Sequence, residues 1–324
     1  MLNLAPIIVI TFSYLTLSAS ASPQTQSSGH PAGEPILNLE ITKVPVGFGP
    51  QGIAFTLGAV WVAYGSDKEF GVARIDPTTN KVVARVLAGR WPVGAAAGEG
   101  SVWVVNRDDN SITRIDPESN RALAPIRVGK KPLGVEVGEG SIWVTNTGDG
   151  TVSRIDFQTN AVTATIHVGK QPSGVSISNG AVSVSNFGGR LTRGGSLVCV
   201  DPKTNAVTQT FKVSFANVAL AQGDDVWVSS QYDHTILRID AKSGRIVTTI
   251  PVRGQPSGLV VSKDNLWATD YEHATLWKID LQKNSIAGKA EVGNGPVIFG
   301  RGAVPDGAVW VSNSESGSVM KIKP

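Results

Sequence analysis

One segment recurs along this chain at intervals of 40 to 44 residues, and a tryptophan occupies the same position in all but one of its copies. Gly100–Asn106 (GSVWVVN) matches Gly140–Asn146 (GSIWVTN) at most positions. The same register contains a tryptophan in every unit but one: Trp61, Trp103, Trp143, Ser183, Trp227, Trp267 and Trp310. A repeat of this length indicates one small structural unit copied many times, and it has to be recognised before domains are counted.

Each unit contains four short segments in which polar and apolar residues alternate. Around Trp143 they are Gly134–Val137, Ser141–Asn146, Thr151–Asp156 and Ala161–Val168, which we call strands A to D. A connector of the form Gly-x-x-Pro-x-Gly joins most D strands to the next strand A. Four strands in a period of about 40 to 45 residues are typical of a propeller blade. The Asp that ends the Arg-Ile-Asp segment of strand C is predicted to accept hydrogen bonds from its own turn.

The two ends of the sequence complete one another. The seventh unit stops after strand C, at Ser318–Lys323. A strand of type D is found instead before the first unit, at Leu37–Val46 (LNLEITKVPV). We therefore predict an all-β, seven-bladed β-propeller of four-stranded blades over residues 37–324. Its ring is closed by the N-terminal strand, which completes the last blade.

The first residues have the features of an export signal. Leu4–Leu17 is an apolar run, shorter than the roughly 20 residues of a membrane span, and Ala19-Ser20-Ala21 fits a cleavage site. We expect a signal peptide at 1–21 and a flexible leader at 22–36, in a periplasmic or secreted protein with no membrane span after cleavage. No Lys or Arg precedes the run, so a retained anchor is the alternative. The single Cys excludes an internal disulfide framework.

Trp143-Val144-Thr145-Asn146, followed by Arg154-Ile155-Asp156, resembles the YVTN-repeat β-propeller family, with Trp where that family often has Tyr. The repeats are also similar to those of virginiamycin B lyases and gluconolactonase-type propellers. The lyase resemblance implies a metal-dependent enzyme with glutamates and a histidine base near the channel mouth. The last two D-to-A connectors contain neither Glu nor His, so only Asp270, Glu272 and His273 are available for those roles.

The D-to-A and B-to-C connectors lie on one face of such a propeller, at the mouth of its channel, where loops usually carry function. They contain many cations and a tryptophan: Arg90, Trp91, Arg107, Lys130, Lys131, Lys170, Arg190, Arg193 and Arg253. Converging cations focus a positive potential that attracts an anion or an acidic partner. The alternative is solvated charge, balanced by the acids Asp108, Asp109, Asp149 and Asp233.

The third residue after each tryptophan position is polar in all seven units: Tyr64, Asn106, Asn146, Asn186, Ser230, Asp270 and Asn313. Such a ring of amides is suited to orienting a ligand. Alternatively, the amides cap strand ends and hold the turns. Only Asp270 supplies a carboxylate, whereas Mg²⁺ and Ca²⁺ sites usually contain several. We therefore expect no metal and no cofactor, with Mg²⁺ or Ca²⁺ reserved for the enzymatic alternative.

Blades five and six contain matching segments, Tyr232-Asp233-His234 and Tyr271-Glu272-His273. Histidine beside a carboxylate is the minimum for general acid–base chemistry. His273, Glu272 and His234 are thus the catalytic candidates if the protein is an enzyme, and a pair of solvent-exposed histidines is the alternative. His167, on an outer strand D, is not expected to be a ligand.

Blade four departs most from the repeat. Ser183 replaces the tryptophan, the connector at 186–196 is five residues longer than its counterpart in blade three, and Val213–Asn217 replaces Gly-x-x-Pro-x-Gly. Breaks of this kind indicate either a recognition surface or neutral drift. Cys199, which stands where other blades have Arg or Lys, is predicted to be a buried, inert thiol.

The sequence predicts an exported binding or scaffold protein that recognises a protein or a small anionic ligand at this loop face. The expected contact residues are Arg90, Trp91, Asn106, Lys130, Asn146, Lys170, Asn186, Arg193, Arg253, Asp270 and Asn313. A monomer is expected. The net charge of +3 is too small to indicate nucleic-acid binding. The alternative is a metal-dependent lyase or lactonase at the same channel mouth, and a third interpretation is a scaffold without a small-molecule site.

Overall fold

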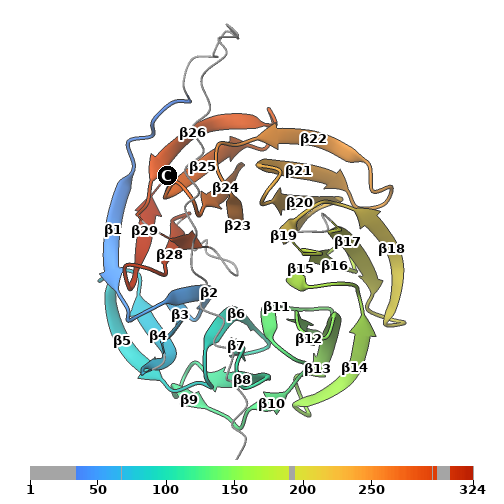
Figure 1. The fold of residues 1–324 in the computed structure, drawn as a ribbon. Coiled ribbons are helices and arrows are strands. Elements are labelled where there is room, and N and C mark those ends of the chain that lie inside the picture. The colour runs from blue at the N-terminus through green and yellow to red at the C-terminus, as the bar shows by residue number, and fades with distance from the viewer. Residues whose placement is uncertain (1–33, 67, 190–193, 294, 298–306, 324) are drawn as a thin grey trace, which may run out of the picture. The chain divides into compact units, whose positions relative to one another are not determined.

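A computed structural model describes residues 34–66, 68–189, 194–293, 295–297 and 307–323. Within these residues the strands form seven antiparallel sheets arranged as blades around a central channel (Figure 1). The all-β, seven-bladed propeller of four-stranded blades is thereby confirmed. Among the described residues, no helix is long and apolar enough to cross a membrane.

The strands follow the order A to D from the channel outward in each blade. The A strands are β2 (Pro50–Thr56), β6 (Pro92–Gly98), β11 (Pro132–Gly138), β15 (Pro172–Ser178), β19 (Ala216–Gln222), β23 (Pro256–Ser262) and β27 (Pro296–Val297). The B strands are β3 (Ala59–Gly65), β7 (Ser101–Asn106), β12 (Ser141–Asn146), β16 (Ala181–Asn186), β20 (Asp225–Ser230), β24 (Asn265–Asp270) and β28 (Val309–Asn313). The C strands are β4 (Phe70–Asp76), β8 (Ser111–Asp116), β13 (Thr151–Asp156), β17 (Ser196–Asp201), β21 (Thr235–Asp240), β25 (Thr275–Asp280) and β29 (Ser318–Lys323). The D strands are β5 (Lys81–Val86), the pair β9 (Arg121–Ala122) and β10 (Ile126–Arg127), β14 (Ala161–His167), β18 (Ala206–Lys212), β22 (Ile246–Pro251), β26 (Ser285–Glu291) and β1 (Glu40–Pro45).

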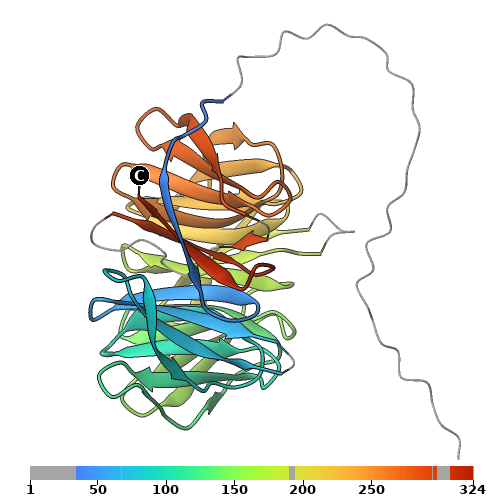
Figure 2. The same cartoon turned by 90° about the vertical axis from the view of Figure 1, so that its left-hand side faces the viewer.

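The ring closes between the first and the last described strands. β1 pairs antiparallel with β29, with Val44 opposite Val319 and Glu40 opposite Lys323, as predicted. The blue strand therefore lies beside the red one in both views (Figures 1 and 2). The chain just before β1 also contacts blade six, because the amide of Leu37 donates to the carbonyl of Lys289 at 2.8 Å. The N-terminal segment thus joins blades six and seven.

The hydrophobic core lies between neighbouring blades. Each B-strand tryptophan is almost fully buried and packs against the next blade. Trp61 is clustered with Ala95, Val102 and Val104 of blade two, and Trp143 with Val182 of blade four. An aromatic side chain buries a large apolar area, so the repeated tryptophan is the main contact that holds one blade to the next.

The arginine of the Arg-Ile-Asp segment joins this core to the neighbouring blade. Arg114 lies over the ring of Trp103 and donates from Nη1 to Asn160 Oδ1 at 3.1 Å, in the C-to-D turn of blade three. Equivalent bonds across the blades are Arg74 to Asn120, Arg154 to Asn205, Arg238 to Asn284, and Lys321 to the carbonyl of Pro77. In blade four both the tryptophan and the arginine are replaced. Ser183 occupies the tryptophan position, and it pairs across the strands with Cys199, which occupies the arginine position.

The aspartate of the same segment holds its own turn, as predicted. Asp116 Oδ1 accepts a hydrogen bond from the amide of Glu118 at 2.9 Å, and its Oδ2 accepts one from Ser119 Oγ at 2.7 Å. These bonds favour the charged carboxylate, so the Ser119 hydroxyl and the Glu118 amide lower the pKa of Asp116. In the Arg-Ile-Asp segment, the arginine therefore connects neighbouring blades and the aspartate stabilises its own turn.

Candidate functional site

The D-to-A and B-to-C connectors meet on one face of the ring, and we call this set of connectors the rim. In blades two to seven, the first residue of the B-to-C connector donates its amide to the D-to-A connector of the same blade. The donors and acceptors are Arg107 to Trp91, Thr147 to Lys131, Phe187 to Gln171, Gln231 to Phe215, Tyr271 to Gln255, and Ser314 to Gly295. These main-chain bonds make the rim a fixed support for its side chains.

The asparagines predicted to face a ligand lie beneath the rim. Asn106 is buried, donates to Thr113 Oγ1 at 2.8 Å and accepts the amide of Gly89 at 3.0 Å. Asn186 and Asn313 each donate to the carbonyl before a connector glycine, Val168 and Val292 respectively, at 2.6 Å. The cap-and-turn alternative accounts for these contacts.

The same packing explains the first glycine of the connector. A Cβ atom on Gly129 would lie 2.6 Å from Cγ of Asn146, closer than real Cβ contacts come. Asn146 itself is buried and donates to Thr151 Oγ1 and Ser153 Oγ of its own blade. Gly129 therefore leaves the space that the Asn146 side chain occupies, and the hydrogen bonds of Asn146 hold its amide in that space.

Several rim cations are neutralised by rim acids. Arg90 Nε lies 2.8 Å from Asp109 Oδ1, and Lys131 Nζ lies 3.0 Å from Asp108 Oδ1 across two blades. The side-chain hydrogen bond from Arg90 lowers the pKa of Asp109. Lys130, Lys170 and Arg253 are exposed, and no ion pair joins Lys130 or Lys170 to another described residue. Arg190 and Arg193 lie outside the described residues.

Trp91 occupies a backbone position that bulky residues rarely adopt. Its φ of +53° lies in the left-handed region, and 36% of the residue is exposed. Lys131, Gln171 and Phe215 have the same conformation at the equivalent connector position. The conformation is thus a property of the connector, and the exposed indole is a feature of blade two.

A hollow opens on the rim between blades three and four, with a volume of about 1020 Å³ including space open to solvent. Its lining residues are Thr147, Gly148, Asp149, Gly150, His167, Gly169, Lys170, Gln171 and Gly188. The hollow brings Lys170 together with His167, which the sequence reasoning set aside because it lies on an outer strand. The signal that marks the place in the sequence is a concentration of glycines, Gly148, Gly150, Gly188 and Gly189, in the two B-to-C connectors.

The Tyr-acid-His segments meet at one connector. Asp270 has no exposed surface and accepts the amide of Gln255 at 2.8 Å and Nδ1 of His273 at 3.1 Å. The side chain of His273 is 56% exposed. His234 instead places Nδ1 2.5 Å from the carbonyl of Gly254, beside Gln255. Within the described ranges, no group of three or more His, Cys, Asp or Glu side chains is arranged to hold a metal ion.

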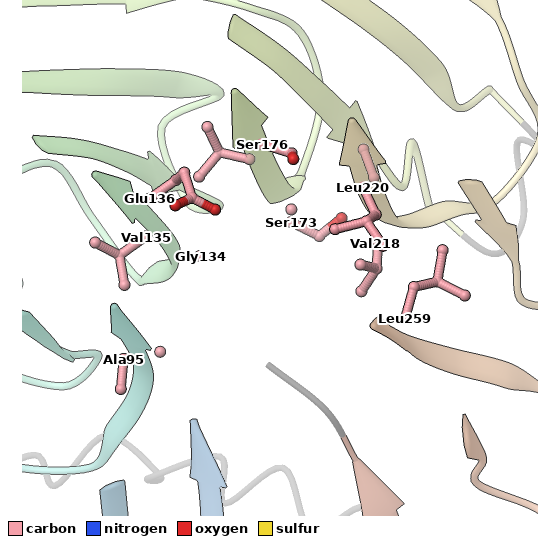
Figure 3. Close-up of a pocket in the computed structure, with 13 residues that line it drawn as sticks. Ala95, Gly134, Val135, Glu136, Ser173, Ser176, Val218, Leu220 and Leu259 are labelled. Atoms are coloured by element: carbon pink, nitrogen blue, oxygen red, sulfur yellow. The ribbon is translucent and has the colours of Figure 1, made fainter. Parts of the chain in front are cut away.

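The central channel contains a second pocket, lined by inner strands of blades two to six (Figure 3). Its volume is about 520 Å³ including space open to solvent. Ala95, Val218, Leu220 and Leu259 make most of it apolar, and Glu136 is the one charged side chain in the lining. Sequence reasoning missed this residue, because a single Glu within a strand A carries no motif.

The irregular exit of blade four builds an aromatic cluster. Phe215 lies 5.9 Å from Phe187 and 5.3 Å from Tyr232 between ring centroids. The cluster fills the rim between blades four and five. Cys199 is a buried free thiol whose pKa is raised by burial, as expected for an inert cysteine.

The fold is similar to that of many solved structures, of which three are described here. The hydrazine synthase of Kuenenia stuttgartiensis has a TM-score of 0.77 and 16% identity, and the match covers 86% of this chain and 96% of that one. A streptogramin B lyase structure has a TM-score of 0.75 and 14% identity, covering 88% and 98%. A chain of a mitotic checkpoint complex has a TM-score of 0.75 and 12% identity, covering 95% and 99%.

No family model matches the chain. No curated protein matches it either. These three structural neighbours are less than 25% identical in sequence, and the likeness to them is one of fold.

Proposed function

We propose that this chain is an exported propeller of the YVTN-repeat type that binds an acidic protein or a small anionic ligand at its rim, and that it acts as a monomer. The observation that carries the proposal is Lys170, an exposed cation on a fixed connector, without an ion pair to the described residues. A cation held on a rigid support and surrounded by little opposing charge is suited to anion recognition.

The rim geometry selects which predicted contact residues take part. Arg90 and Lys131 already neutralise Asp109 and Asp108, so they contribute less free positive charge than the sequence indicates. The contact roles in this proposal belong to Lys130, Lys170 and Arg253. Rim-exposed charges chiefly steer association, and their effect decreases as salt increases.

The test is binding of a decaglutamate peptide to the full chain, measured by calorimetry at low and at physiological salt. The variant combining Lys130→Ala, Lys170→Ala and Arg253→Ala should lose binding and keep its melting temperature. The matched control is a triple variant of cations near the turns of the opposite face, Lys81→Ala, Lys203→Ala and Lys263→Ala. Equal loss in the two triple variants, or none in the rim variant, would overturn the proposal.

A second candidate function, a lyase or lactonase at the same channel mouth, is favoured by the pair of His273 and Asp270. A buried carboxylate that accepts from Nδ1 leaves Nε2 as the proton acceptor of the neutral ring, which is how a general base is oriented. The described residues do not form a metal site there, so no step is assigned to Mg²⁺ or Ca²⁺. Melting temperature measured with Mg²⁺, Ca²⁺ and EDTA, together with the His273→Gln variant, distinguishes the two functions.

A further inference from the structure

Charge on the rim follows a repeated scheme. In blade two, Asp109 accepts both the amide and the guanidinium of Arg90. In blade three, Asp149 accepts the amide of Lys130 at 2.6 Å, at the equivalent position. Each of these D-to-A connectors therefore has an acid of its own blade beside it.

Between blades three and four the scheme is interrupted by glycines. Gly189 stands where blades two and three have Asp109 and Asp149, so Lys170 has no acid from its own blade. Gly148 stands where blade two has Asp108, the partner of Lys131 across the blades. The two substitutions remove both acids that the scheme would place beside this connector.

A third glycine, Gly150, widens the hollow. In blade two, Asn110 Oδ1 accepts the amide of Lys131 at 2.8 Å and occupies the space between the connectors. Gly150 is its counterpart in blade three and adds no side chain there. The glycines that replace the acids of blade two and the glycine that replaces Asn110 therefore lie in the same part of the rim, beside Lys170 and His167.

The lining identifies the chemistry that fits. Lys170 supplies one positive charge, and Gln171, Thr147 and His167 supply polar groups. Apart from the imidazole of His167, no aliphatic or aromatic side chain is among the lining residues. The one carboxylate in the lining, Asp149, already accepts the amide of Lys130 through Oδ2, so Lys170 is the group left to pair with a carboxylate of the ligand.

We infer that this hollow binds a small hydroxylated carboxylate of the sugar-acid type. Its carboxylate contacts Lys170, and its hydroxyl groups contact the polar lining. The inference rests on the proposed function, because it names the ligand class and the position on the rim. A charge-assisted hydrogen bond supplies the larger part of the affinity, and neutral hydrogen bonds supply the selectivity.

The experiment titrates the full chain with glucuronate, glucose and hexanoate, followed by calorimetry and by protein NMR. Glucuronate should bind about tenfold or more tightly than glucose, which lacks the charge, and than hexanoate, which lacks the hydroxyls. Lys170→Gln should weaken glucuronate binding by about tenfold or more, whereas Lys203→Gln, in the opposite turn of the same blade, should leave it unchanged. Gly148→Asp, which restores the blade-two residue, should weaken it as well.

Each outcome decides one point. Binding of hexanoate as tight as that of glucuronate overturns the ligand class, and glucuronate binding that Lys170→Gln does not change overturns the position. If no carboxylate binds but decaglutamate still does, the inference fails and the proposed function stands. If decaglutamate does not bind either, the proposed function fails with it.

Discussion

Arg114 lies with its guanidinium carbon 5.1 Å from the ring centroid of Trp103, and from there it reaches Asn160 in the next blade. One side chain therefore covers the buried indole of its own blade and fastens the turn of its neighbour. We expect Arg114→Ala to lower the free energy of unfolding by about 2 kcal/mol, through the lost cation–π contact and hydrogen bonds. Urea denaturation measures the loss. Arg121→Ala, on an exposed outer strand, is the control and should change it by less than about 0.5 kcal/mol; equal effects would contradict the role of Arg114.

Because Gly129 packs against Asn146, the loss of unfolding free energy caused by a larger residue at 129 should depend on the side chain at 146. Gly129→Ala places a methyl group against the buried amide and should cost about 2 kcal/mol in unfolding free energy. In an Asn146→Gly background, the same substitution should cost much less, because Cβ, Cγ and Nδ2 of Asn146, the atoms nearest to the added methyl group, are gone. A double-mutant cycle by chemical denaturation gives the coupling energy. Strict additivity of the two changes would show that the clash is not the cause.

Acid should destabilise the fold through its turn aspartates. The backbone amide and then the hydroxyl of Thr159 lower the pKa of Asp156, and other turn aspartates shift in the same direction: Asp76, Asp116, Asp201, Asp240 and Asp280. A lowered folded-state pKa contributes stability above the unfolded-state value of about 3.9, and that contribution disappears as the pH falls through the folded-state pKa.

Asp156→Asn isolates one of these contributions. The variant should be less stable than the parent at pH 7, and the difference should shrink as the pH falls below about 4. Melting temperatures measured from pH 7 to pH 2 follow the change. Parallel curves for parent and variant would show that the charge of Asp156 is not coupled to folding.

Cys199 should be almost unreactive in the native protein. Burial both shields the thiol and raises its pKa, so little thiolate is available. A disulfide reagent should modify it at least about a hundredfold more slowly in buffer than in denaturant, with the unfolded chain as the internal control. Native labelling at the denatured rate would place the thiol at the surface.

The blade number, the strand order and the ring closure could be predicted from the sequence, because each unit contains its own turn residues and its own alternation of apolar residues. The pairing across blades could not. Arg114 and Asn160 are 46 residues apart, and no local pattern connects them. The rim shows the same limit: the sequence left open whether its acids balance its cations, and only the fold places Asp109 beside Arg90 and Asp108 beside Lys131. The hollow beside Lys170 lies where glycines replace the larger residues of blade two, and these glycines become a signal only when equivalent connector positions are compared.

Because β1 pairs with β29, the two ends of the described chain lie in the same blade, and the chain could begin at another blade without changing the order of blades around the ring. Because the outermost strand of blade seven comes from the opposite end of the described chain, that blade cannot be completed until both ends are present. A circularly permuted chain, with these ends linked and a new start placed between blades three and four, would contain the same strand pairs but would close elsewhere. Such a permutant would complete the β1–β29 blade from one continuous segment and bring blades three and four together last, and it would show whether late closure governs the rate of folding.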